Sequence, residues 1–405
     1  MDEIEIPQYF ICPISLQIMR DPVTAVTGIT YDRESMEHWL STAKDATCPV
    51  SNQPLPRDSD LTPNHTLRRL IQAWCTANAT NGVDQIPTPK PPLDRAQVLK
   101  LIQDLGVAPL HFKTLKKIEA LATENERNRK CMAEAGVAEE MASLIVRCFK
   151  ENRTRGLENT LKILHLTWTP TPQIKLLANE NSDFLDSLTW VLGCDMENHV
   201  LVKTHAMLVL KMTMEVASSN SLYRLKLEFF KKIVRVLREK ISKQAINAAL
   251  RVLIDMCPWG RNRMKIVEAG AVFELIELEL EKPEKNITEL IFCLMAHLCS
   301  CADGRAQFLK HACGIAMLCK RLLRVSPVTD DRAVHVIALI SKFSATDEVV
   351  LEMLKVGVVS KLCMVLQVDC ATYLKQKARR VLRLHSNVWK DSPCIAVYLM
   401  TRYPS

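Results

Sequence analysis

The sequence predicts a mainly α-helical protein in which a small α+β domain precedes a long α-solenoid. Residues 1–92 contain 11 of the 19 prolines, whereas the other 313 residues contain 8. Proline is excluded from helix interiors because it lacks the N–H and clashes with the preceding turn, so the second part is mostly helix. Glycines there recur at 270, 314 and 357, and intervals of 44 and 43 residues are typical of stacked helical repeats. A Pro-rich linker at 80–94 separates a domain at 5–79 from repeats at 95–400.

The composition limits the class of protein. A chain of 405 residues is too long for one ordinary core, and 48% apolar with 24% charged residues is a globular balance. The net charge of +8 is spread along the chain, and only 5% of residues are aromatic. Nucleic-acid binding would need a Lys/Arg stripe with stacking aromatics, so no nucleic-acid partner is expected.

Neither a leader nor a membrane span is expected. Met1–Glu5 is acidic and lacks an apolar stretch, and the longest apolar runs, Leu290–Ala296 and Cys394–Met400, are too short to cross a bilayer. Most of the fifteen cysteines occupy apolar helical positions, where a free thiol behaves as a small hydrophobe. We therefore expect reduced cysteines and a soluble, cytoplasmic protein.

The first domain alternates loops with short regular elements. The expected elements, in chain order, are a loop at 9–22, strands at 23–26 and 29–31, a helix at 33–43, a loop at 48–56 and a helix that begins at 62–64. Thr27-Gly28 supplies the hairpin turn. The apolar residues at helical spacing are Met36, Trp39 and Leu40 in the first helix and Leu67, Leu70, Ile71 and Trp74 in the second.

Each repeat is expected to contain three helices. A short helix ends at a step such as Ala135-Gly136 or Ala269-Gly270, where glycine can take the left-handed conformation. A second helix follows, and a more buried third helix, as at 245–256 and 333–343, completes the unit. Two degenerate units are expected near Asn181 and Lys226, followed by helices at 184–192 and 229–237. The period favours armadillo or HEAT repeats, and an irregular helical bundle is the alternative.

Five motifs in the first domain resemble a U-box. They are Ile6-Pro7-x-Tyr9-Phe10-x-Cys12-Pro13-Ile14-Ser15-Leu16, Met19-x-Asp21-Pro22-Val23, Gly28-Ile29-Thr30-Tyr31-Asp32-Arg33, Cys48-Pro49-Val50 and Leu61-Thr62-Pro63-Asn64-His65-Thr66-Leu67-Arg68. With the repeats behind them, the full chain resembles the plant U-box–armadillo ubiquitin ligases. The resemblance implies a zinc-free, RING-like α+β U-box followed by a right-handed armadillo-type solenoid. Cys257-Pro258-Trp259-Gly260 resembles the Cys-x-Pro-Gly motif of one short subgroup, with proline and the intervening residue exchanged, whose members are associated with immune and stress signalling.

The residues themselves also speak against zinc. Zinc ligands come in close pairs, whereas Cys12 and Cys48 stand 36 residues apart and His38 and His65 lack partners at suitable spacing. No metal or cofactor is expected, and polar side chains must brace the loops instead. The candidates for bracing or structural support are Cys12, Ser15, Asp21, Tyr31, Arg33, Glu34 and Cys48. Neither Cys12 nor Cys48 has an activating His or cationic neighbour, so no covalent catalytic nucleophile is expected.

The resemblance implies a docking surface for a ubiquitin-charged conjugating enzyme (E2). Ile14 and Leu16 match the apolar contacts of the family's first loop, Trp39 its helix contact and Pro49 its second-loop contact. Trp39 could instead be a core aromatic, and Cys12 and Ile14 could equally be core supports. Asn52 stands where many RING and U-box ligases place an arginine that bridges the E2 and its ubiquitin. Asn52 could equally just close a turn.

The third helices of the repeats are expected to line a concave face. In peptide-binding armadillo proteins these helices carry an asparagine ladder, but the matching positions here are Val252, His297 and Leu339. This departure favours a folded partner over an extended peptide. His297 and His335 lie among apolar helical residues, a setting more typical of core histidines than of ligands.

The expected function is that of an E3 ubiquitin-protein ligase. The U-box would recruit the charged E2, the repeats would bind a protein substrate, and ubiquitin would pass directly to a substrate lysine, in plant defence or stress signalling. The first alternative is a non-catalytic armadillo scaffold or adaptor. A zinc-dependent enzyme is disfavoured by the ligand spacing.

Overall fold

The fold is described from a computed structural model, which describes residues 6–42, 47–56, 59–79, 93–179 and 182–402. The chain divides into two compact units, residues 1–92 and residues 93–405. The expected linker at 80–94 lies outside the described residues except for its last two positions. No helix in the described ranges combines the length and the apolar character that crossing a membrane requires.

The first unit contains short strands and two helices. Its elements are η1 (Gln8–Phe10), β1 (Pro22–Thr24), β2 (Thr30–Asp32), α1 (Arg33–Thr42), β3 (Thr62–Pro63) and α2 (His65–Ala77). The three strands form an antiparallel sheet in the order β2-β1-β3. The predicted hairpin is confirmed, with Val23 opposite Tyr31. Gly28 has φ of 80° at its turn, a left-handed conformation that favours glycine.

The sequence missed β3, because Thr62-Pro63 reads as the start of a helix. Pro63 has no N–H to donate and is tolerated here because β3 is an edge strand. The helix begins after Asn64, whose side chain accepts a hydrogen bond from the Leu67 N–H at 3.0 Å. Leu70, predicted to face the core, is 53% exposed, and Cys75 packs inside instead.

The second unit is an array of helices. Its helices are α3 (Arg95–Leu105), α4 (His111–Glu124), α5 (Glu126–Glu134), α6 (Val137–Lys150), α7 (Leu157–Leu166), α8 (Pro172–Asn179), α9 (Ser182–Gly193), α10 (His199–Val216), α11 (Ser219–Tyr223), α12 (Leu227–Glu239), α13 (Lys243–Met256), α14 (Asn262–Glu268), α15 (Ala271–Leu280), α16 (Lys285–Leu298), α17 (Ala302–Lys310), α18 (Gly314–Arg321), α19 (Pro327–Phe343), α20 (Asp347–Lys355), α21 (Val358–Gln367), α22 (Thr372–Leu384), α23 (Ser386–Trp389) and α24 (Pro393–Arg402). Three-helix units begin at α5, α8, α11, α14, α17 and α20. The helices expected at 184–192 and 229–237 correspond to α9 and α12.

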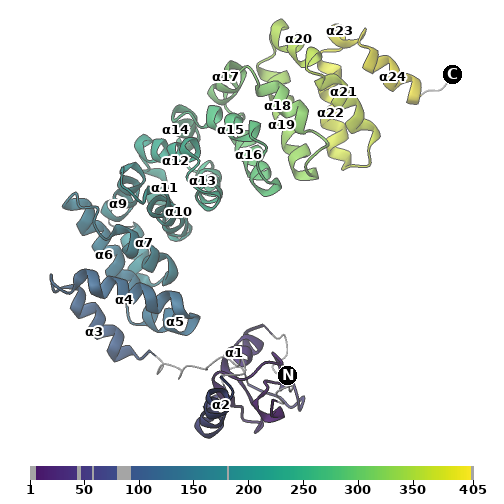
Figure 1. The fold of residues 1–405 in the computed structure, drawn as a ribbon. Helices are drawn as coiled ribbons and strands as arrows, with labels where there is room; N and C mark the ends of the chain where they lie inside the picture. The colour runs from purple at the N-terminus through teal and green to yellow at the C-terminus, as the bar shows by residue number, and fades with distance from the viewer. Residues whose placement is uncertain (1–5, 43–46, 57–58, 80–92, 180–181, 403–405) are drawn as a thin grey trace. The chain divides into compact units, whose positions relative to one another are not determined.

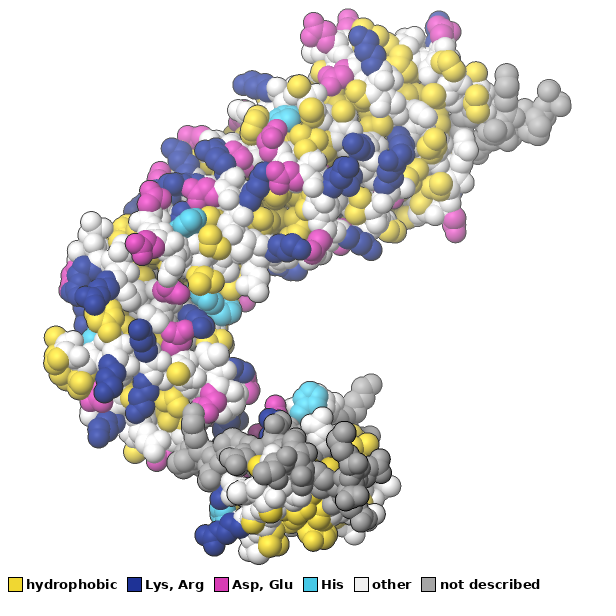
Figure 2. Space-filling view, in the orientation of Figure 1, with side chains coloured by type: hydrophobic (Ala, Val, Ile, Leu, Met, Phe, Trp, Pro, Cys, Tyr) yellow, Lys and Arg dark blue, Asp and Glu magenta, His cyan; other side chains and the backbone are white. Residues whose placement is uncertain are grey.

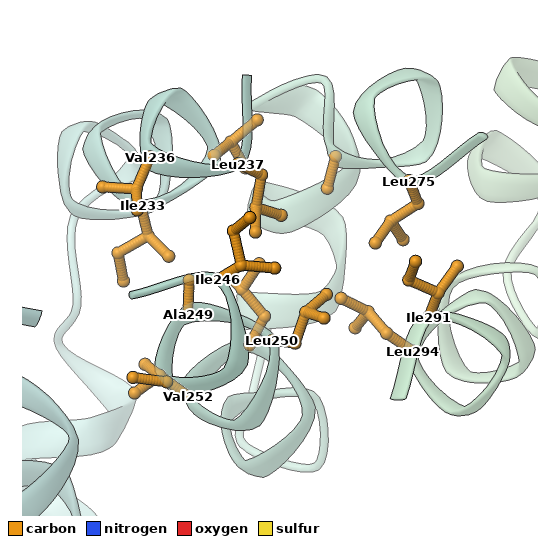
Figure 3. Close-up of a cluster of buried hydrophobic side chains, with 14 of the residues drawn as sticks. Ile233, Val236, Leu237, Ile246, Ala249, Leu250, Val252, Leu275, Ile291 and Leu294 are labelled. Atoms are coloured by element: carbon orange, nitrogen blue, oxygen red, sulfur yellow. The ribbon is translucent and has the colours of Figure 1, made fainter. Parts of the chain in front are cut away.

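The third helices of successive units pack against one another, and α4, which precedes the first unit, packs against α7 in the same way. The series α4, α7, α10, α13, α16, α19 and α22 runs along one side of the array, which we call the inner face (Figure 1). A continuous apolar core joins the units, and Figure 3 shows part of it, where α12 and α13 meet α15 and α16. Leu250 of α13, Leu275 of α15 and Leu294 of α16 are all fully buried there. No unit could bury these side chains alone, so the array is stable only when stacked.

Three details of the repeats differ from expectation. Gly136, Gly270 and Gly357 precede their helices with φ of 86–88°, but Gly314 does not have a left-handed φ. A Cβ at Gly314 would lie 2.8 Å from the carbonyl oxygen of Phe308, so close backbone approach explains that glycine. Val252, predicted to line the concave face, is 1% exposed and packs in the core.

The reverse holds for His297 and His335, which were expected to be core histidines but are only partly buried on their third helices. The helical period explains these misplacements. A third helix packs against neighbours on more than one face. Sequence spacing alone therefore does not tell whether an apolar residue of that helix points into the core or toward the inner face.

Candidate functional site

Two loops of the first unit share one backbone form. The first runs from Ile11 to Ile18 and the second from Thr47 to Pro54, and an antiparallel bridge closes each at those residues. The Cys12 N–H donates to the Gln17 carbonyl at 2.8 Å, and the Cys48 N–H donates to the Gln53 carbonyl at 2.8 Å. The underlying segments are Cys-Pro-Ile-Ser-Leu-Gln and Cys-Pro-Val-Ser-Asn-Gln. The loops are therefore structural duplicates.

A buried cysteine sulfur lies at the centre of each loop. The Cys12 Sγ accepts a hydrogen bond from the Asp32 N–H at 3.2 Å. The Cys48 Sγ lies 2.9 Å from the Tyr31 hydroxyl and accepts from the Thr27 hydroxyl and the Ser51 N–H, each at 3.4 Å. Cys12, Cys48 and Tyr31 are fully buried. Hydrogen bonds to these sulfurs join each loop to the hairpin, and a support role for Cys12, Tyr31 and Cys48 stays a prediction.

The hydrogen bonds change the acidity of both thiols. Burial acts to raise the pKa of Cys48, but hydrogen bonds from Ser51, Thr27 and Tyr31 outweigh it and lower the pKa to about 6. The pKa of Cys12 is also lowered, because hydrogen bonds from Asp32, Ser15 and Ile14 outweigh its burial. Burial, followed by the bond to Cys48, raises the pKa of Tyr31 well above its usual range. Tyr31 therefore keeps its proton, and its hydroxyl can donate a hydrogen bond to the Cys48 sulfur.

Charged groups hold the first loop against the helices. The Arg33 Nε donates to Asp21 Oδ2 at 2.6 Å, and the Arg68 guanidinium lies 3.7 Å from Asp21 Oδ1. Asp32 Oδ1 accepts from the backbone N–H groups of Arg20 and Asp21, at 2.7 and 2.9 Å. Asp21 thus contacts a basic side chain of α1 and one of α2.

Glu34, proposed as a brace, is exposed and has no ion pair among the described residues. Glu37, one turn later, lies 3.7 Å from Arg33 instead. Sequence reasoning overlooked Asp32 because it reads as a helix cap.

Most of the predicted docking residues lie on the two loops. Leu16 is 77% exposed, Ile14 and Pro49 are partly buried, and Asn52 is exposed. Trp39 of α1 is partly buried, and its Nε1–H donates to the Thr47 carbonyl at 2.9 Å, at the start of the second loop. Trp39 therefore positions the second loop as well as packing beside the core. Asn52 has φ of 56° and closes a turn onto the Cys48 carbonyl.

Val50 was missed by the sequence reasoning. It is 53% exposed in the second loop at the place of Ile14 in the first. The signal was available in the duplicated Cys-Pro-(Ile/Val)-Ser pattern, which pairs the two residues. Leu16 and Val50 are thus exposed apolar side chains, one on each loop, and side chains of this kind anchor many protein interfaces.

The two loop cysteines are not accessible to a partner. Both cysteine sulfurs are inaccessible, so neither can accept an acyl group from a large partner. In the part of the chain that the structure describes, no three His, Cys, Asp or Glu side chains are grouped so that they could hold a metal ion. All fifteen cysteines are free.

Comparisons with known proteins match both units. A family model described as the plant U-box protein ARM repeat region matches residues 97–405, and a U-box domain model matches residues 6–80. "E3 ubiquitin-protein ligase PUB23" of Arabidopsis thaliana is 44% identical over 408 residues, covering 100% of this chain and 98% of the relative. "E3 ubiquitin-protein ligase PUB24" of the same plant is 43% identical over 446 residues, covering 99% and 96%.

Solved structures agree on the fold alone. A structure from work on the interaction between cadherin and β-catenin has 12% identity and a TM-score of 0.59, covering 79% of this chain and 58% of that chain. An engineered protein has 16% identity and a TM-score of 0.53, covering 76% and 72%. The predicted armadillo-type solenoid behind a U-box is thereby confirmed. The chain belongs to the plant U-box proteins with an armadillo repeat region, and it is a U-box E3 ubiquitin-protein ligase.

Proposed function

We propose that the two loops and α1 recruit a ubiquitin-charged E2, while the armadillo repeats hold a protein substrate. The E2 surface consists of Ile14, Leu16, Trp39, Pro49 and Asn52, to which Val50 is added. Ubiquitin passes directly from the E2 to a substrate lysine, with no covalent intermediate on this chain. Catalysis then comes from proximity and from holding the ubiquitin thioester in an attack-ready pose.

The exposure of Leu16 is the observation that carries this proposal. A leucine that is 77% exposed at φ of 57° gives nothing to the core and occupies a conformation that leucine disfavours. Folding therefore does not explain why a leucine stands there, whereas an apolar anchor for a partner does.

Reversing the character of Leu16 tests the proposal. Leu16→Asp should leave the fold intact, since Asp tolerates the left-handed conformation better than Leu. Losing an interface anchor costs about 2 kcal/mol or more, so E2 affinity in calorimetry should fall roughly thirtyfold, with ubiquitin transfer lost.

Leu70→Asp is the matched control, because Leu70 is 53% exposed on α2 and lies outside both loops. The Leu70→Asp variant should bind E2 as tightly as the unchanged chain. Equal E2 affinity of Leu16→Asp and the unchanged chain would reject the docking surface. Failure of the unchanged chain to discharge any loaded E2 would favour the non-catalytic scaffold.

The substrate side of the proposal rests on the inner face of the repeats. Because Val252 is buried and His297 and Leu339 take the other ladder positions, that face has no asparagine series at the matched positions for an extended backbone. We propose a folded substrate domain as the main ligand. Ubiquitination of a captured substrate should disappear when residues 95–405 are removed, while E2 discharge by the U-box remains.

We place this ligase in the cytoplasm, in plant defence or stress signalling. The Cys257–Gly260 loop, which resembles the signature of a subgroup with those roles, supports this assignment. Disruption of the gene in the source plant should alter its response to a microbial elicitor, and a fluorescent fusion should locate in the cytoplasm. An unaltered response would reject the assignment.

A further inference from the structure

Two aromatic side chains meet where α11 ends and where the loop between α13 and α14 passes it. The rings of Tyr223 and Trp259 are perpendicular, with their centres 5.6 Å apart. Tyr223 is 53% exposed, and Trp259 is partly buried against the apolar core. We call these two residues the aromatic pair. Because α11 and α14 are first helices, the pair lies outside the series of third helices that forms the inner face.

Trp259 stands where matching units cap their first helix. In the units that begin at α5 and α20, the caps are Asn125 and Thr346, each eleven residues before the left-handed glycine of its unit. Each of these side chains accepts a hydrogen bond from the N–H three residues later. Trp259 is also eleven residues before its glycine, Gly270, but α14 begins only at Asn262 and has no side-chain cap. Helix formation therefore does not explain why a tryptophan stands there.

Hydrogen bonds from α14 fix the backbone on both sides of Tyr223. The Asn262 Nδ2 donates to the Leu222 carbonyl at 2.9 Å, and the Lys265 Nζ donates to the Leu225 carbonyl. Asn262 is fully buried. The backbone that carries one ring is thus joined to the helix that follows the other ring. The aromatic pair is therefore held in place before a partner arrives, which reduces the entropy lost on binding.

The polar atoms of the aromatic pair are not used within the chain. Among the described residues, neither the Trp259 Nε1–H nor the Tyr223 hydroxyl has a hydrogen-bond partner. The Trp259 nitrogen is also not a buried atom, so a partner can reach it. Rings with a free N–H and a free O–H suit a ligand that combines apolar surface with carbonyl acceptors.

Two arginines flank the aromatic pair. Arg224 directly follows Tyr223, and Arg261 lies two residues after Trp259. Both arginines are exposed, and neither has an ion-pair partner in the part of the chain that the structure describes. Aromatic pairs also bind quaternary ammonium groups such as methylated lysine, but these charges would repel such a cation. They favour instead a ligand with a carboxylate beside its apolar part.

We propose that the aromatic pair binds a proline-rich segment of a partner protein that carries a carboxylate next to its prolines. Proline rings pack on the two aromatic rings, the Trp259 Nε1–H donates to a backbone carbonyl of the segment, and Arg224 or Arg261 receives the carboxylate. A proline-rich segment suits this surface because its polyproline II backbone has no internal hydrogen bonds, keeps its carbonyls open and is already ordered. This surface is additional to those proposed for the E2 and the substrate.

The geometry disfavours a nucleic acid as the ligand. Successive bases stack parallel to one another, whereas the two rings are perpendicular, so neighbouring bases could not stack on both. A phosphate backbone also needs a continuous basic track. Figure 2 shows basic and acidic side chains intermixed over the face of the repeats that it draws.

Binding of a synthetic peptide to the full chain tests the proposal. A fluorescein-labelled peptide Glu-Pro-Pro-Leu-Pro-Pro-Glu is compared, by anisotropy, with Glu-Ala-Ala-Leu-Ala-Ala-Glu, which has the same charge. We expect the alanine peptide to bind about tenfold more weakly or not at all. Tyr223→Ala should weaken binding of the proline peptide about tenfold or more. Trp259→Phe keeps a ring but removes the N–H, and it should weaken binding about threefold or more.

Tyr373→Ala is the matched control, because Tyr373 is 52% exposed on α22, in another unit. Its affinity for the proline peptide should stay within about twofold of that of the unchanged chain. Arg224→Gln/Arg261→Gln should weaken binding and make it less dependent on salt, because salt screens the contact with the carboxylate. Discharge of loaded E2 to free lysine, measured on the same samples, should be unchanged in every variant.

Several results would overturn the proposal. They are equal affinity for the two peptides, absence of binding, equal affinity of Tyr223→Ala and the unchanged chain, and displacement of the peptide by trimethyllysine or by single-stranded oligo(dT). Peptide binding that appears only when Pro87, Pro89, Pro91 and Pro92 of the linker are replaced by alanine would also overturn it, because the occupant would then be the linker. If E2 discharge is intact in those cases, only this inference fails.

Discussion

Leu16 and Asn52 occupy the same position in the two duplicated loops of the U-box. Their φ angles are 57° and 56°, and each donates its backbone N–H to the carbonyl of the cysteine four residues earlier, at 2.9 Å. The same left-handed site thus carries an exposed apolar side chain in one loop and a polar one in the other. Asn tolerates this conformation better than Leu, so the turn explains Asn52 without a partner, whereas it does not explain Leu16.

Asn52→Arg tests whether this position also reaches toward ubiquitin. Arginine offers more donors and a longer reach, so discharge of the loaded E2 should become faster if the site bridges E2 and ubiquitin. A gain of about 1.4 kcal/mol at the transition state would be tenfold in a single-turnover discharge rate. Asn52→Gly keeps the turn and removes the side chain, which makes it the control. An unchanged rate in Asn52→Arg, with intact E2 binding, would assign Asn52 to the turn alone.

We predict two roles for Trp39, a hydrogen bond that positions the second loop and a contact with the E2, which substitutions can separate. Trp39→Phe keeps a ring but removes the hydrogen bond to the Thr47 carbonyl, which should cost about 1 kcal/mol of U-box stability and weaken E2 binding only severalfold. Trp39→Ala removes the anchor as well and should weaken E2 binding roughly thirtyfold, while substrate binding by the repeats is spared. Calorimetry against an E2 measures both variants. If Trp39→Ala binds as well as the unchanged chain, Trp39 is a core residue and not a contact.

The stability of the U-box should depend on pH through Cys48. The pKa of Cys48 is about 6 in the folded chain against a usual value of 9.0, so between these values the unfolded chain binds the proton and the folded chain does not. The free energy of unfolding of the U-box should therefore rise between pH 6 and pH 9, and this contribution is lost as the pH falls from 9 through 6. The slope approaches 1.4 kcal/mol per pH unit at about the middle of this range. Hydrogen exchange of U-box peptides in the full chain, at pH 6.5 and 8, measures this.

Cys48→Ser is the control for that experiment, because serine does not ionise. In Cys48→Ser, U-box stability should rise less steeply with pH. The pH dependence that remains is attributed to Cys12, whose pKa is also lowered. Tyr31→Phe should raise the pKa of Cys48 and reduce the slope in part, since it removes one of the hydrogen bonds to sulfur. A slope identical in Cys48→Ser and the unchanged chain would show that the thiol of Cys48 does not cause it.

The repeats could be predicted because their pattern is redundant. Helical period, left-handed glycines and a fixed spacing all indicate the same units, so even the degenerate helices α9 and α12 were located. The direction in which a side chain of a third helix points is indicated only by the apolar spacing, with no second signal to support it. Val252 and His297 both fit an apolar stripe, yet Val252 is buried and His297 is only partly buried once the units are stacked.

The site was predicted in part, for a related reason. Motif resemblance located the two loops, but the hydrogen bonds that Thr27, Tyr31 and Asp32 make with the cysteine sulfurs connect residues 17 to 21 positions apart and leave no local signal. Asp32 was missed because, just before α1, it reads as a helix cap. Val50 was missed because a single valine between Pro49 and Ser51 carries no motif of its own. Their roles follow from the pairing of the loops, which the sequence contains as a duplicated six-residue pattern.

The last prediction concerns Gly260 in the Cys257-Pro258-Trp259-Gly260 loop. Gly260 has φ of 51°, and a Cβ there would lie 2.7 Å from Cδ1 of Tyr223, whose ring packs edge-on against Trp259. Gly260→Ala should therefore destabilise this repeat for two separate reasons. The left-handed conformation costs alanine about 1 kcal/mol, and displacement of Tyr223 adds to that.

A double-mutant cycle separates the two costs. In a Tyr223→Ala background the steric cost disappears, so Gly260→Ala should then cost only the conformational part. Hydrogen exchange of peptides from α13 and α14, in the full chain, reports the local opening free energy in each variant. If Gly260→Ala costs the same with and without Tyr223, the ring does not determine this glycine and backbone conformation alone accounts for it.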